Sequence, residues 1–308
     1  MLKSSCVYAI FKKILRAVFY ALADSGFLNW ISDKTLIKMQ YKFKIGKNLD
    51  ISSPKTFNEK IQWLKLYGNL QNYSHLVDKY EVRKYIAETI GEEYLIPLIG
   101  VWDRFDDIDF EELPNQFALK CTHDSGSVII CTNKSAFNIK ETKNKLNKCL
   151  KRNFYYPTRE PQYKNIKPRI IGEKYMVDES GIELMDYKIF CFNGEPKIIQ
   201  VNYNRNIDHR LNFYDTEWNY ISIQLKPHLT DPTKLIDKPN NLDKMLTLAK
   251  TLSKNYPFVR VDFYSINDKI YFGELTFTPN AGYKEFEPEE FGVQLGNLMK
   301  SIPYKEFM

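Results

Sequence analysis

The chain has 308 residues, of which 44% are hydrophobic, so it is long enough for two or three packed subdomains and is not a disordered chain. Its net charge of +6 suits anionic ligands such as nucleotides, or an anionic membrane face, but lacks the basic stripe of nucleic-acid binders. The five cysteines are odd in number and form no C-x-x-C pair, so neither a disulfide framework nor a zinc site is expected, and a reducing, cytoplasmic compartment is the simpler interpretation.

The first predicted element is an amphipathic helix over residues 7–23, VYAIFKKILRAVFYALA. Cations interrupt its apolar run, so the segment is too short and too charged to span a bilayer. As a helix it separates apolar residues from cations, with Val7, Phe11, Ile14, Val18 and Leu22 on one face and Lys12, Lys13 and Arg16 opposite. Two interpretations stay open: a helix docked on the protein's own core, which we favour, and peripheral membrane contact.

Further helices follow in the first third of the chain. Residues 54–67 have apolar side chains at helical spacing, with Thr56 as the expected N-cap and Glu59 three residues later. A second helix is predicted over 78–90. Residues 1–112 are therefore predicted to be mainly helical.

Beyond residue 114 the pattern changes to short strands joined by tight turns. Ser125-Gly126-Ser127 marks the tip of one hairpin, and Asn193-Gly194 is a strong turn signal for another. Strands are predicted over 117–120, 128–131, 169–176, 185–192, 196–202, 258–264 and 269–275, and helices over 138–151, 241–254 and from 287 onward. This pattern indicates an α+β body behind a helical front, with no G-x-G-x-x-G dinucleotide motif.

The strongest chemical signal lies in residues 260–282, RVDFYSINDKIYFGELTFTPNAG. Asp262 is in the middle of one predicted strand, and Glu274 and Thr276 share one face of the strand paired with it. Two acids that face the same way on neighbouring strands are unfavourable unless a cation lies between them. Mg²⁺, which takes one or two carboxylates plus phosphate oxygens, is the natural candidate. The alternative is that both acids line a solvated sheet face.

Two weaker signals precede this segment. Lys120 is followed by the small-residue tip 125–127, where backbone N–H groups and a lysine charge suit phosphate groups. Residues 171–176, followed by 186–188, form an extended segment whose backbone suits adenine and whose acids suit ribose hydroxyls. Taken singly, such features are more often an ordinary surface hairpin or a plain strand.

In this order, the three signals resemble the ATP-grasp superfamily, and more closely its TupA-like family, named for teichuronopeptide biosynthesis. The resemblance covers most of the chain and rests on PKTFNEKIQW (54–63), DKYEVR (78–83), Leu119-Lys120-Cys121, Asp186-Tyr187-Lys188, RVDF (260–263) and Gly273-Glu274. It implies an ATP-grasp fold of the α+β class, in which two α+β subdomains clasp ATP next to a mainly helical N-terminal region. The implied domains are a helical region (1–112), a lid subdomain (113–176) and a core subdomain with the metal site (177–308).

The resemblance also implies roles for single residues, with ATP and Mg²⁺ as cofactors. Nucleotide binding is implied for Lys120, Ser125, Gly126, Ser127, Glu173, Lys174, Tyr175, Met176 and Asp186, and metal binding for Asp262, Glu274, Thr276 and Asn280. The family pattern has Asn as its third metal ligand, so Thr276 is a departure for which Asn280 is the candidate replacement. The predicted catalytic residues are Lys188, Arg205 and Arg210, with the two arginines as a clamp for a carboxylate or an oxyanion.

The activity implied by the resemblance is that of an ATP-dependent carboxylate–amine ligase that works through an acyl phosphate. The family setting implies that an amino acid or a sugar acid is joined by an amide bond during biosynthesis of a bacterial surface polysaccharide, such as capsule, O-antigen or teichuronopeptide. Three alternatives stay open: a glycosyltransferase that uses the acidic stretch 106–109, a phosphotransferase that stops at phosphoryl transfer, and a non-catalytic binding module.

Overall fold

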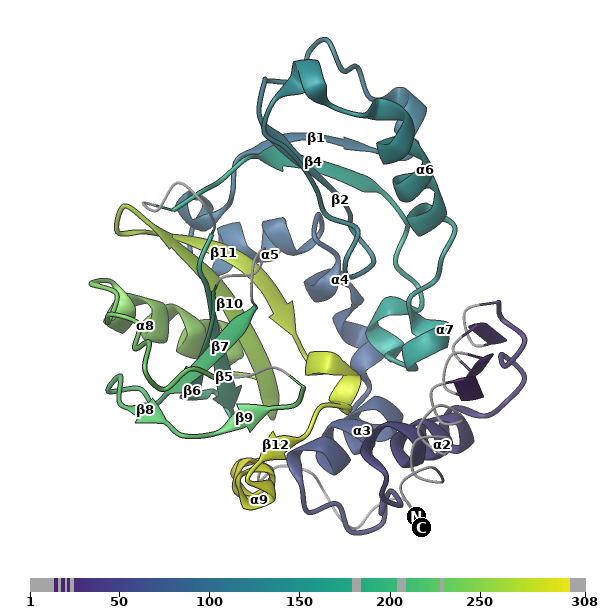
Figure 1. Cartoon of the computed structure of the whole chain (residues 1–308), viewed down its shortest axis with the longest axis vertical. Coiled ribbons are helices and arrows are strands. Elements are labelled where there is room, and N and C mark those ends of the chain that lie inside the picture. Colours follow the sequence, from purple (N-terminus) through teal and green to yellow (C-terminus); the bar gives the residue numbers. More distant parts are fainter. Residues whose placement is uncertain are drawn as a thin grey trace, which may run out of the picture.

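The computed structural model describes residues 14, 15, 18, 19, 21, 22, 25–178, 184–203, 209–227 and 230–299. Two antiparallel sheets form the body of the molecule, and the N-terminal helices lie beside them (Figure 1). Sheet A has the strand order β1-β4-β2-β3, and sheet B has the order β11-β10-β5-β6-β7-β8. Most of sheet A falls within the predicted lid (113–176) and sheet B within the predicted core (177–308), but the division into these domains stays a prediction.

Sheet A consists of β1 (Leu98–Trp102), β4 (Ile170–Lys174), β2 (Phe117–Cys121) and β3 (Ile129–Cys131). One face packs on α6 (Ile139–Leu150) through a core that includes Phe117, Leu119 and Leu146. Because side chains alternate along β2, Lys120 points to the opposite face. Strand β1 lies inside the region predicted to be mainly helical, so the lid sheet draws one strand from that region.

Sheet B consists of β11 (Lys269–Thr276), β10 (Phe258–Ile266), β5 (Asp186–Phe192), β6 (Glu195–Tyr203), β7 (Arg210–Tyr214) and β8 (Tyr220–Ile221). The helix α8 (Leu242–Ser253) covers one face. Part of the other face is covered by α3 (Phe57–Tyr67), whose Phe57 packs on Phe258 and Phe190 in an aromatic cluster. The rest of that face is polar and carries the candidate site.

The remaining elements connect these layers. The helices are α2 (Asp33–Ile45), α4 (Ser74–Val77), α5 (Val82–Thr89), α7 (Tyr155–Thr158) and α9 (Glu289–Leu298), and β9 (Gln224–Leu225) pairs with β12 (Phe286–Glu287). Short 3₁₀ turns are η1 (Leu70–Tyr73), η2 (Glu92–Tyr94), η3 (Phe105–Asp107), η4 (Lys134–Ala136), η5 (Pro161–Tyr163) and η6 (Pro279–Gly282). Most of the predicted N-terminal helix, residues 7–23, lies outside the described residues.

The predicted N-terminus of α3 is confirmed. The N–H of Glu59 donates to the hydroxyl of Thr56 (3.2 Å), and the Glu59 carboxylate accepts from the N–H of Thr56 (2.9 Å), which completes a capping box. The predicted turn at Asn193-Gly194 is also confirmed, since both residues have positive φ (49° and 81°), as a two-residue hairpin requires.

Removing this cap gives a first prediction. Thr56→Ala should lower the free energy of unfolding by about 1 kcal/mol, because it leaves an N–H group of the first helical turn without its partner. Urea denaturation of the variant and of Thr56→Ser would check this. Thr56→Ser keeps the hydroxyl and should stay close to the native value; equal losses in both variants would contradict the cap.

The helix predicted over 78–90 is wrong in its first turn. The chain leaves helical geometry at Asp78 (ψ 120°), and α5 begins only at Val82. The Asp78 carboxylate instead accepts hydrogen bonds from the N–H groups of Tyr80 (2.7 Å) and Glu81 (3.1 Å). An aspartate that binds its own following backbone competes with helix formation, so the helix is split at this point.

Candidate active site

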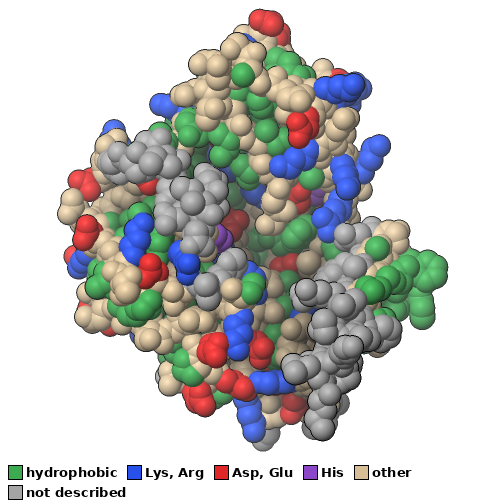
Figure 2. Space-filling view, in the orientation of Figure 1, with side chains coloured by type: hydrophobic (Ala, Val, Ile, Leu, Met, Phe, Trp, Pro, Cys, Tyr) green, Lys and Arg blue, Asp and Glu red, His purple; other side chains and the backbone are tan. Residues whose placement is uncertain are grey.

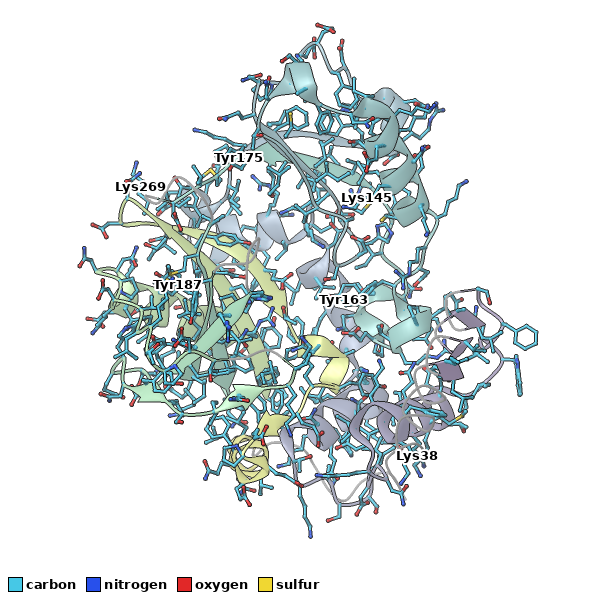
Figure 3. All side chains as sticks on the ribbon, in the orientation of Figure 1. Lys38, Lys145, Tyr163, Tyr175, Tyr187 and Lys269 are labelled. Atoms are coloured by element: carbon cyan, nitrogen blue, oxygen red, sulfur yellow. The ribbon has the colours of Figure 1, made fainter. Side chains whose placement is uncertain are left out.

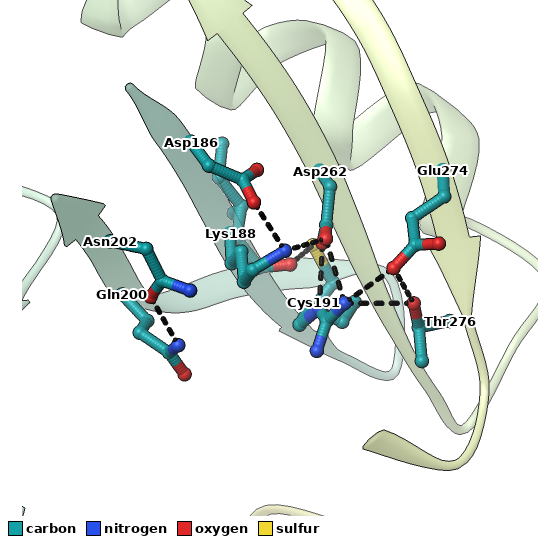
Figure 4. Close-up of polar contacts among 10 residues, drawn as sticks. Asp186, Lys188, Cys191, Gln200, Asn202, Asp262, Glu274 and Thr276 are labelled. Atoms are coloured by element: carbon teal, nitrogen blue, oxygen red, sulfur yellow. Dashed lines mark hydrogen bonds and ion pairs between the residues drawn. The ribbon is translucent and has the colours of Figure 1, made fainter. Parts of the chain in front are cut away.

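A row of charged side chains crosses sheet B on the same face as α3, beyond the aromatic cluster that α3 covers (Figure 4). Lys188 of β5, Asp262 of β10 and Glu274 of β11 are lateral neighbours in the strand pairing. Two residues along the strands, Arg260 pairs with Thr276. Glu274 and Thr276 share a face by alternation, and a one-residue shift of the β10–β11 register between Phe263 and Asp262 brings the predicted Asp262 to the same face.

Arg260 is the cation that lies between the two acids. Its Nε donates to Oδ1 of Asp262 (2.6 Å), and its Nη2 donates to Oδ2 of Asp262 (2.7 Å), Oε1 of Glu274 (2.8 Å) and Oγ1 of Thr276 (3.0 Å). Lys188 forms further ion pairs with Asp186 (2.7 Å) and with Asp262. The sequence pattern suggested Mg²⁺ as the cation between these acids, and here a guanidinium fills that place. No cluster of three His, Cys, Asp or Glu side chains suited to a metal ion occurs among the described residues.

Glu274 is the most accessible acid of the row. Its side chain is 46% exposed in the cleft, whereas Asp262 is buried. The surrounding protein atoms alone would raise the pKa of Glu274, but Arg260, Lys188 and Lys79 outweigh this and lower its pKa from 4.5 to about 2. The carboxylate is therefore ionised at neutral pH and open to solvent on one side.

The low pKa of Glu274 predicts a pH dependence of stability. A carboxyl group whose pKa falls on folding stabilises the folded chain above its unfolded pKa, and this contribution is lost as the pH falls through the folded pKa. The difference in free energy of unfolding between the native chain and Glu274→Gln should therefore shrink between about pH 4.5 and about pH 2. Denaturant titrations across this range would check it, and a constant difference would contradict the low pKa.

Sheet A presents a second ion pair. Nζ of Lys120 lies 2.6 Å from Oε2 of Glu173, and Nη1 of Arg83 lies 3.7 Å from Oε1 of the same carboxylate. Lys120, Arg83 and Glu173 line one small cavity together with Gly273, the neighbour of Glu274. The lid residues therefore meet the row of sheet B at its β11 edge, where the surface is hollowed (Figure 2).

The predicted adenine segment, Glu173 to Met176, lies at the connection between the two sheets. Strand β4 ends at Lys174, and the next strand, β5, belongs to sheet B. Tyr175 lies at this end of sheet A (Figure 3). The N–H of Lys174 donates to the carbonyl oxygen of Pro97 (2.9 Å), which fixes the start of the connection.

The small-residue loop joins β2 and β3, as predicted. The hydroxyl of Ser127 is buried; it accepts from the N–H of Cys121 (2.8 Å) and donates to the carboxylate of Asp124 (2.5 Å). Ser127 therefore holds the loop in shape rather than facing a ligand with its side chain. Gly126 (φ +91°) has open space around its Cα. Within the described part of the chain, the N–H groups of Ser125 and Gly126 donate no hydrogen bond.

Lys79 is a site residue that the sequence analysis did not single out. Its N–H donates to the carbonyl oxygen of Thr122 (3.1 Å), and its ammonium group donates to the carbonyl oxygen of Asp124, so it lies directly beneath the β2–β3 loop. Burial lowers the pKa of Lys79, and the negative charge of Glu274 opposes this shift. Lys79 therefore lies within electrostatic reach of both sheets. It belongs to the DKYEVR motif, so the signal was present in the sequence.

Tyr163 is a second addition, for which no sequence signal existed. It ends η5 and lies near the centre of the molecule (Figure 3). Burial and the charges of Glu160 and Glu274 raise the pKa of Tyr163 well above its usual value. Its phenol therefore stays protonated and is a hydrogen-bond donor near the row.

The model of the TupA-like ATP-grasp family matches residues 59–300, which is most of the chain. The chain belongs to the TupA-like ATP-grasp family. This confirms the predicted family, the predicted α+β ATP-grasp fold and the predicted enzyme class, an ATP-grasp ligase. The comparison with curated proteins gave no match.

Among solved structures, this TupA-like chain is similar to D-alanine–D-alanine ligase from Helicobacter pylori, with 14% identity, 82% of this chain and 70% of the other covered, and a TM-score of 0.40. The same enzyme from Bacillus anthracis, complexed with ATP, has 15% identity, coverage of 72% and 62%, and a TM-score of 0.41. Biotin carboxylase from Campylobacter jejuni has 12% identity, coverage of 80% and 53%, and a TM-score of 0.42. The chain spans less than two thirds of the latter two proteins.

Arg210 of the TupA-like chain does not join the row. Asn202 pairs with Asp186 on the face of the row, so the next residue, Tyr203, and its partner Arg210 project from the opposite face. This register places Arg210 away from the row, and its role as a clamp for a substrate stays a prediction. The other predicted clamp residue, Arg205, lies outside the described residues.

Asn280 lies in η6, outside the hydrogen-bonded row. It is exposed and has a left-handed conformation (φ 52°). Three polar side chains of α3 hold this turn: Asn58 donates to the carbonyl oxygen of residue 282 (3.0 Å), Gln62 to those of residues 281 and 282, and Lys65 to that of residue 281 (2.8 Å). Asn58 and Gln62 belong to the segment PKTFNEKIQW (54–63), which therefore helps to position the turn that follows β11.

Proposed function

We propose that this chain is an ADP-forming carboxylate–amine ligase that activates a carboxylate as an acyl phosphate and joins it to an amine. The observation that carries the proposal is the meeting of Lys79 and Lys120 with the edge of the row that contains Asp262 and Glu274. Phosphoryl transfer depends mainly on positioning and charge stabilisation, which paired lysines and carboxylates of this kind supply.

The donor set fits a magnesium ion. Mg²⁺ is usually held by one or two carboxylates, with water and substrate phosphates completing its shell. The Oε1 of Glu274 is engaged by Arg260, but its Oε2 accepts no hydrogen bond from a described residue, and the side chain is accessible. Asp262 and Glu274 would hold the ion, with Thr276 or Asn280 as a neutral oxygen donor. When bound, the ion supplies positive charge to the ATP phosphates.

The lid residues are assigned to the nucleotide. Lys79 and Lys120 neutralise phosphate charge, and the N–H groups of Ser125 and Gly126 bind phosphate oxygens, since they have no partner among the described residues. The segment 173–176 holds adenine. A carboxylate oxygen of the substrate then attacks the γ-phosphorus, which breaks the bond to ADP and forms the acyl phosphate. The amine attacks the acyl carbon and loses a proton, and inorganic phosphate leaves.

The substrate is assigned to the β5–β6 end of the row. Beyond Lys188 lie two buried amides on β6, and Nε2 of Gln200 donates to Oδ1 of Asn202 (2.6 Å; Figure 4). The side-chain oxygen Oε1 of Gln200 and the side-chain nitrogen Nδ2 of Asn202 have no partner among the described residues. They offer one acceptor and one donor beside the charge of Lys188. Arg205 is a further candidate to bind the substrate.

The proposed setting is biosynthesis of a bacterial surface polysaccharide on the cytoplasmic side, with an amino acid or a sugar acid as a substrate. The family name supports this setting. The competing glycosyltransferase would use the acidic stretch 106–109, but there Asp106 pairs with Lys143 (2.5 Å) and Asp107 with Arg104 (3.8 Å), as in a solvated loop. These contacts favour the ligase.

The test is to incubate the purified chain with Mg-ATP and panels of amino acids and sugar acids, and to record ADP and phosphate. ADP formation that requires both a carboxylate and an amine is expected. ADP formation with one substrate alone and a stable phosphorylated product would replace the ligase by a phosphotransferase. If no panel supports turnover and Mg-ATP does not raise the unfolding temperature, the ATP-dependent function is wrong.

A further inference from the structure

The turn before α2 exposes two large aromatic side chains. Phe27 is 66% exposed and Trp30 is 79% exposed, whereas Leu28 between them is 9% exposed. Figure 2 shows hydrophobic side chains that project at the right-hand edge of the molecule, over the N-terminal segment. Single exposed apolar residues are ordinary, but two neighbouring aromatic residues with this exposure mark a contact surface.

The turn is held so that these aromatics stay outside. The buried guanidinium of Arg159 donates to the carbonyl oxygen of Leu28 (2.9 Å), and Leu28 packs on Leu36 of α2. Arg159 also lies 3.4 Å from Asp33, the first residue of α2. Leu28 therefore points inward, and the side chains on either side of it are directed to solvent by a fixed backbone rather than by local disorder.

The exposed half of α2 continues the surface. Met39 and Phe43 are exposed one helical turn apart, and Lys34, Lys38 and Lys42 are exposed at the same spacing beside them. These three lysines form no ion pair within the described part of the chain, unlike Lys47, which lies 2.6 Å from Glu289. Phe43 contacts Phe19 (5.7 Å between ring centroids). The nearby residues Ile14, Leu15, Val18 and Leu22 are also exposed.

Acidic groups are nearly absent from this surface. Between residues 25 and 45 the sequence contains one acid, Asp33. Its carboxylate accepts from the hydroxyl of Tyr155 (2.7 and 2.6 Å) and lies beside Arg159, so its charge is compensated from inside the molecule. The surface therefore carries apolar groups and positive charge together, which complements an anionic surface with an apolar interior.

We propose that residues 27–43 form a membrane-docking surface that binds the anionic face of a lipid bilayer. Trp and Phe insert at the boundary between headgroups and acyl chains, while lysines contact anionic headgroups and keep their stems along the apolar layer. Among the described residues, no helix is long and apolar enough to cross a bilayer. The proposal adds residues 27–43 to residues 7–23, for which membrane contact was one of the two open interpretations of the sequence.

Vesicle co-sedimentation of the full chain tests the proposal. The chain should bind phosphatidylcholine vesicles with about one third phosphatidylglycerol at least about tenfold more tightly than pure phosphatidylcholine, and high salt should weaken the binding. The double variant Phe27→Ser, Trp30→Ser should lose most of its binding to both kinds of vesicle. The triple variant Lys34→Gln, Lys38→Gln, Lys42→Gln should lose the preference for the anionic lipid.

Matched controls keep the test specific. Leu235 is 61% exposed elsewhere, so Leu235→Ser should bind vesicles like the native chain. Lys84, Lys140 and Lys254 are exposed on other elements, so their triple change to Gln should keep the lipid preference. All variants should unfold at the native temperature. The proposal is overturned by absent or lipid-independent binding, by equal losses in the controls, or by an aromatic variant that changes only self-association in size-exclusion chromatography.

Discussion

Replacing Asp262 by Asn is expected to reduce ADP formation at least about a thousandfold. Asp262 is the hub of the row, because its carboxylate accepts two hydrogen bonds from Arg260 and the ion pair with Lys188. The side-chain amide of Asn offers only one acceptor oxygen to Arg260 and Lys188. Its NH₂ group is a donor and would face one of these two cations. The variant therefore loses a metal-binding charge and releases Arg260 from its fixed position. ADP release under saturating Mg-ATP is the measurement.

Loss of fold must be separated from loss of chemistry in Asp262→Asn. Removing one partner from a buried ion pair destabilises a protein by roughly 3–5 kcal/mol, so the unfolding temperature and the circular dichroism spectrum have to be recorded with the activity. Asp268→Asn, at the exposed turn of the same hairpin, is the matched control and should keep both. If folded Asp262→Asn forms ADP within about tenfold of the native rate, the row is not the site of phosphoryl transfer.

The polar row is the part of the site that the sequence predicts best. Side chains two apart on a strand share a face whatever the rest of the fold does, so Glu274 and Thr276 follow from alternation alone. The position of Asp262 opposite Glu274 does not follow from the short turn between the two strands alone. The turn pairs Phe263 with Phe272, which would place Asp262 opposite Gly273, and a one-residue shift of the register between Phe263 and Asp262 moves the pairing to Glu274. Another local rule gave the capping box of α3.

The identity of the cation between the acids could not be predicted in this way. Arg260 was visible two residues before Asp262, but its reach across to Glu274 depends on how a long side chain lies on the finished sheet. The position of Arg210 could not be predicted for a related reason. Only the pairing of Arg210 with β6 shows that this residue begins a strand and faces away from the row. The pairing of neighbouring strands therefore decides both which acids Arg260 reaches and on which face of the sheet Arg210 lies.

The split helix at Asp78 shows how a local signal is overridden. The segment 78–90 has the periodicity of one helix, yet the N–H of Lys79 donates to Thr122, more than forty residues later in the chain. The break directs the ammonium group of Lys79 towards the β2–β3 loop instead of solvent. A departure from a local rule thus coincides with a residue of the candidate site, as expected when function and propensity conflict.

Lys79→Met gives the second large prediction: kcat/KM for ATP should fall about a hundredfold while the fold is retained. The buried ammonium group of Lys79 interacts electrostatically with Glu274, Lys120 and Asp124. It lies beneath the loop that is assigned to the phosphates. Glu274 and Asp124 neutralise only part of the charge of Lys79, and bound phosphate groups would supply further negative charge beside it. Met fills a similar volume, but removing one partner of a buried charged contact can destabilise a protein, so the unfolding temperature has to be recorded with the kinetics.

The loss should lie in nucleotide binding and in turnover together, because Lys79 touches no group assigned to the other substrates. Steady-state kinetics with varied ATP and isothermal titration with ADP would separate these contributions. Lys84→Met is the matched control, since Lys84 is on the adjoining helix with 82% of its side chain exposed and forms an ion pair only with Glu88 among the described residues. If Lys79→Met keeps native affinity and rate, Lys79 is an anchor of the loop backbone, and the phosphate charge must then be met by Lys120 and the ion alone.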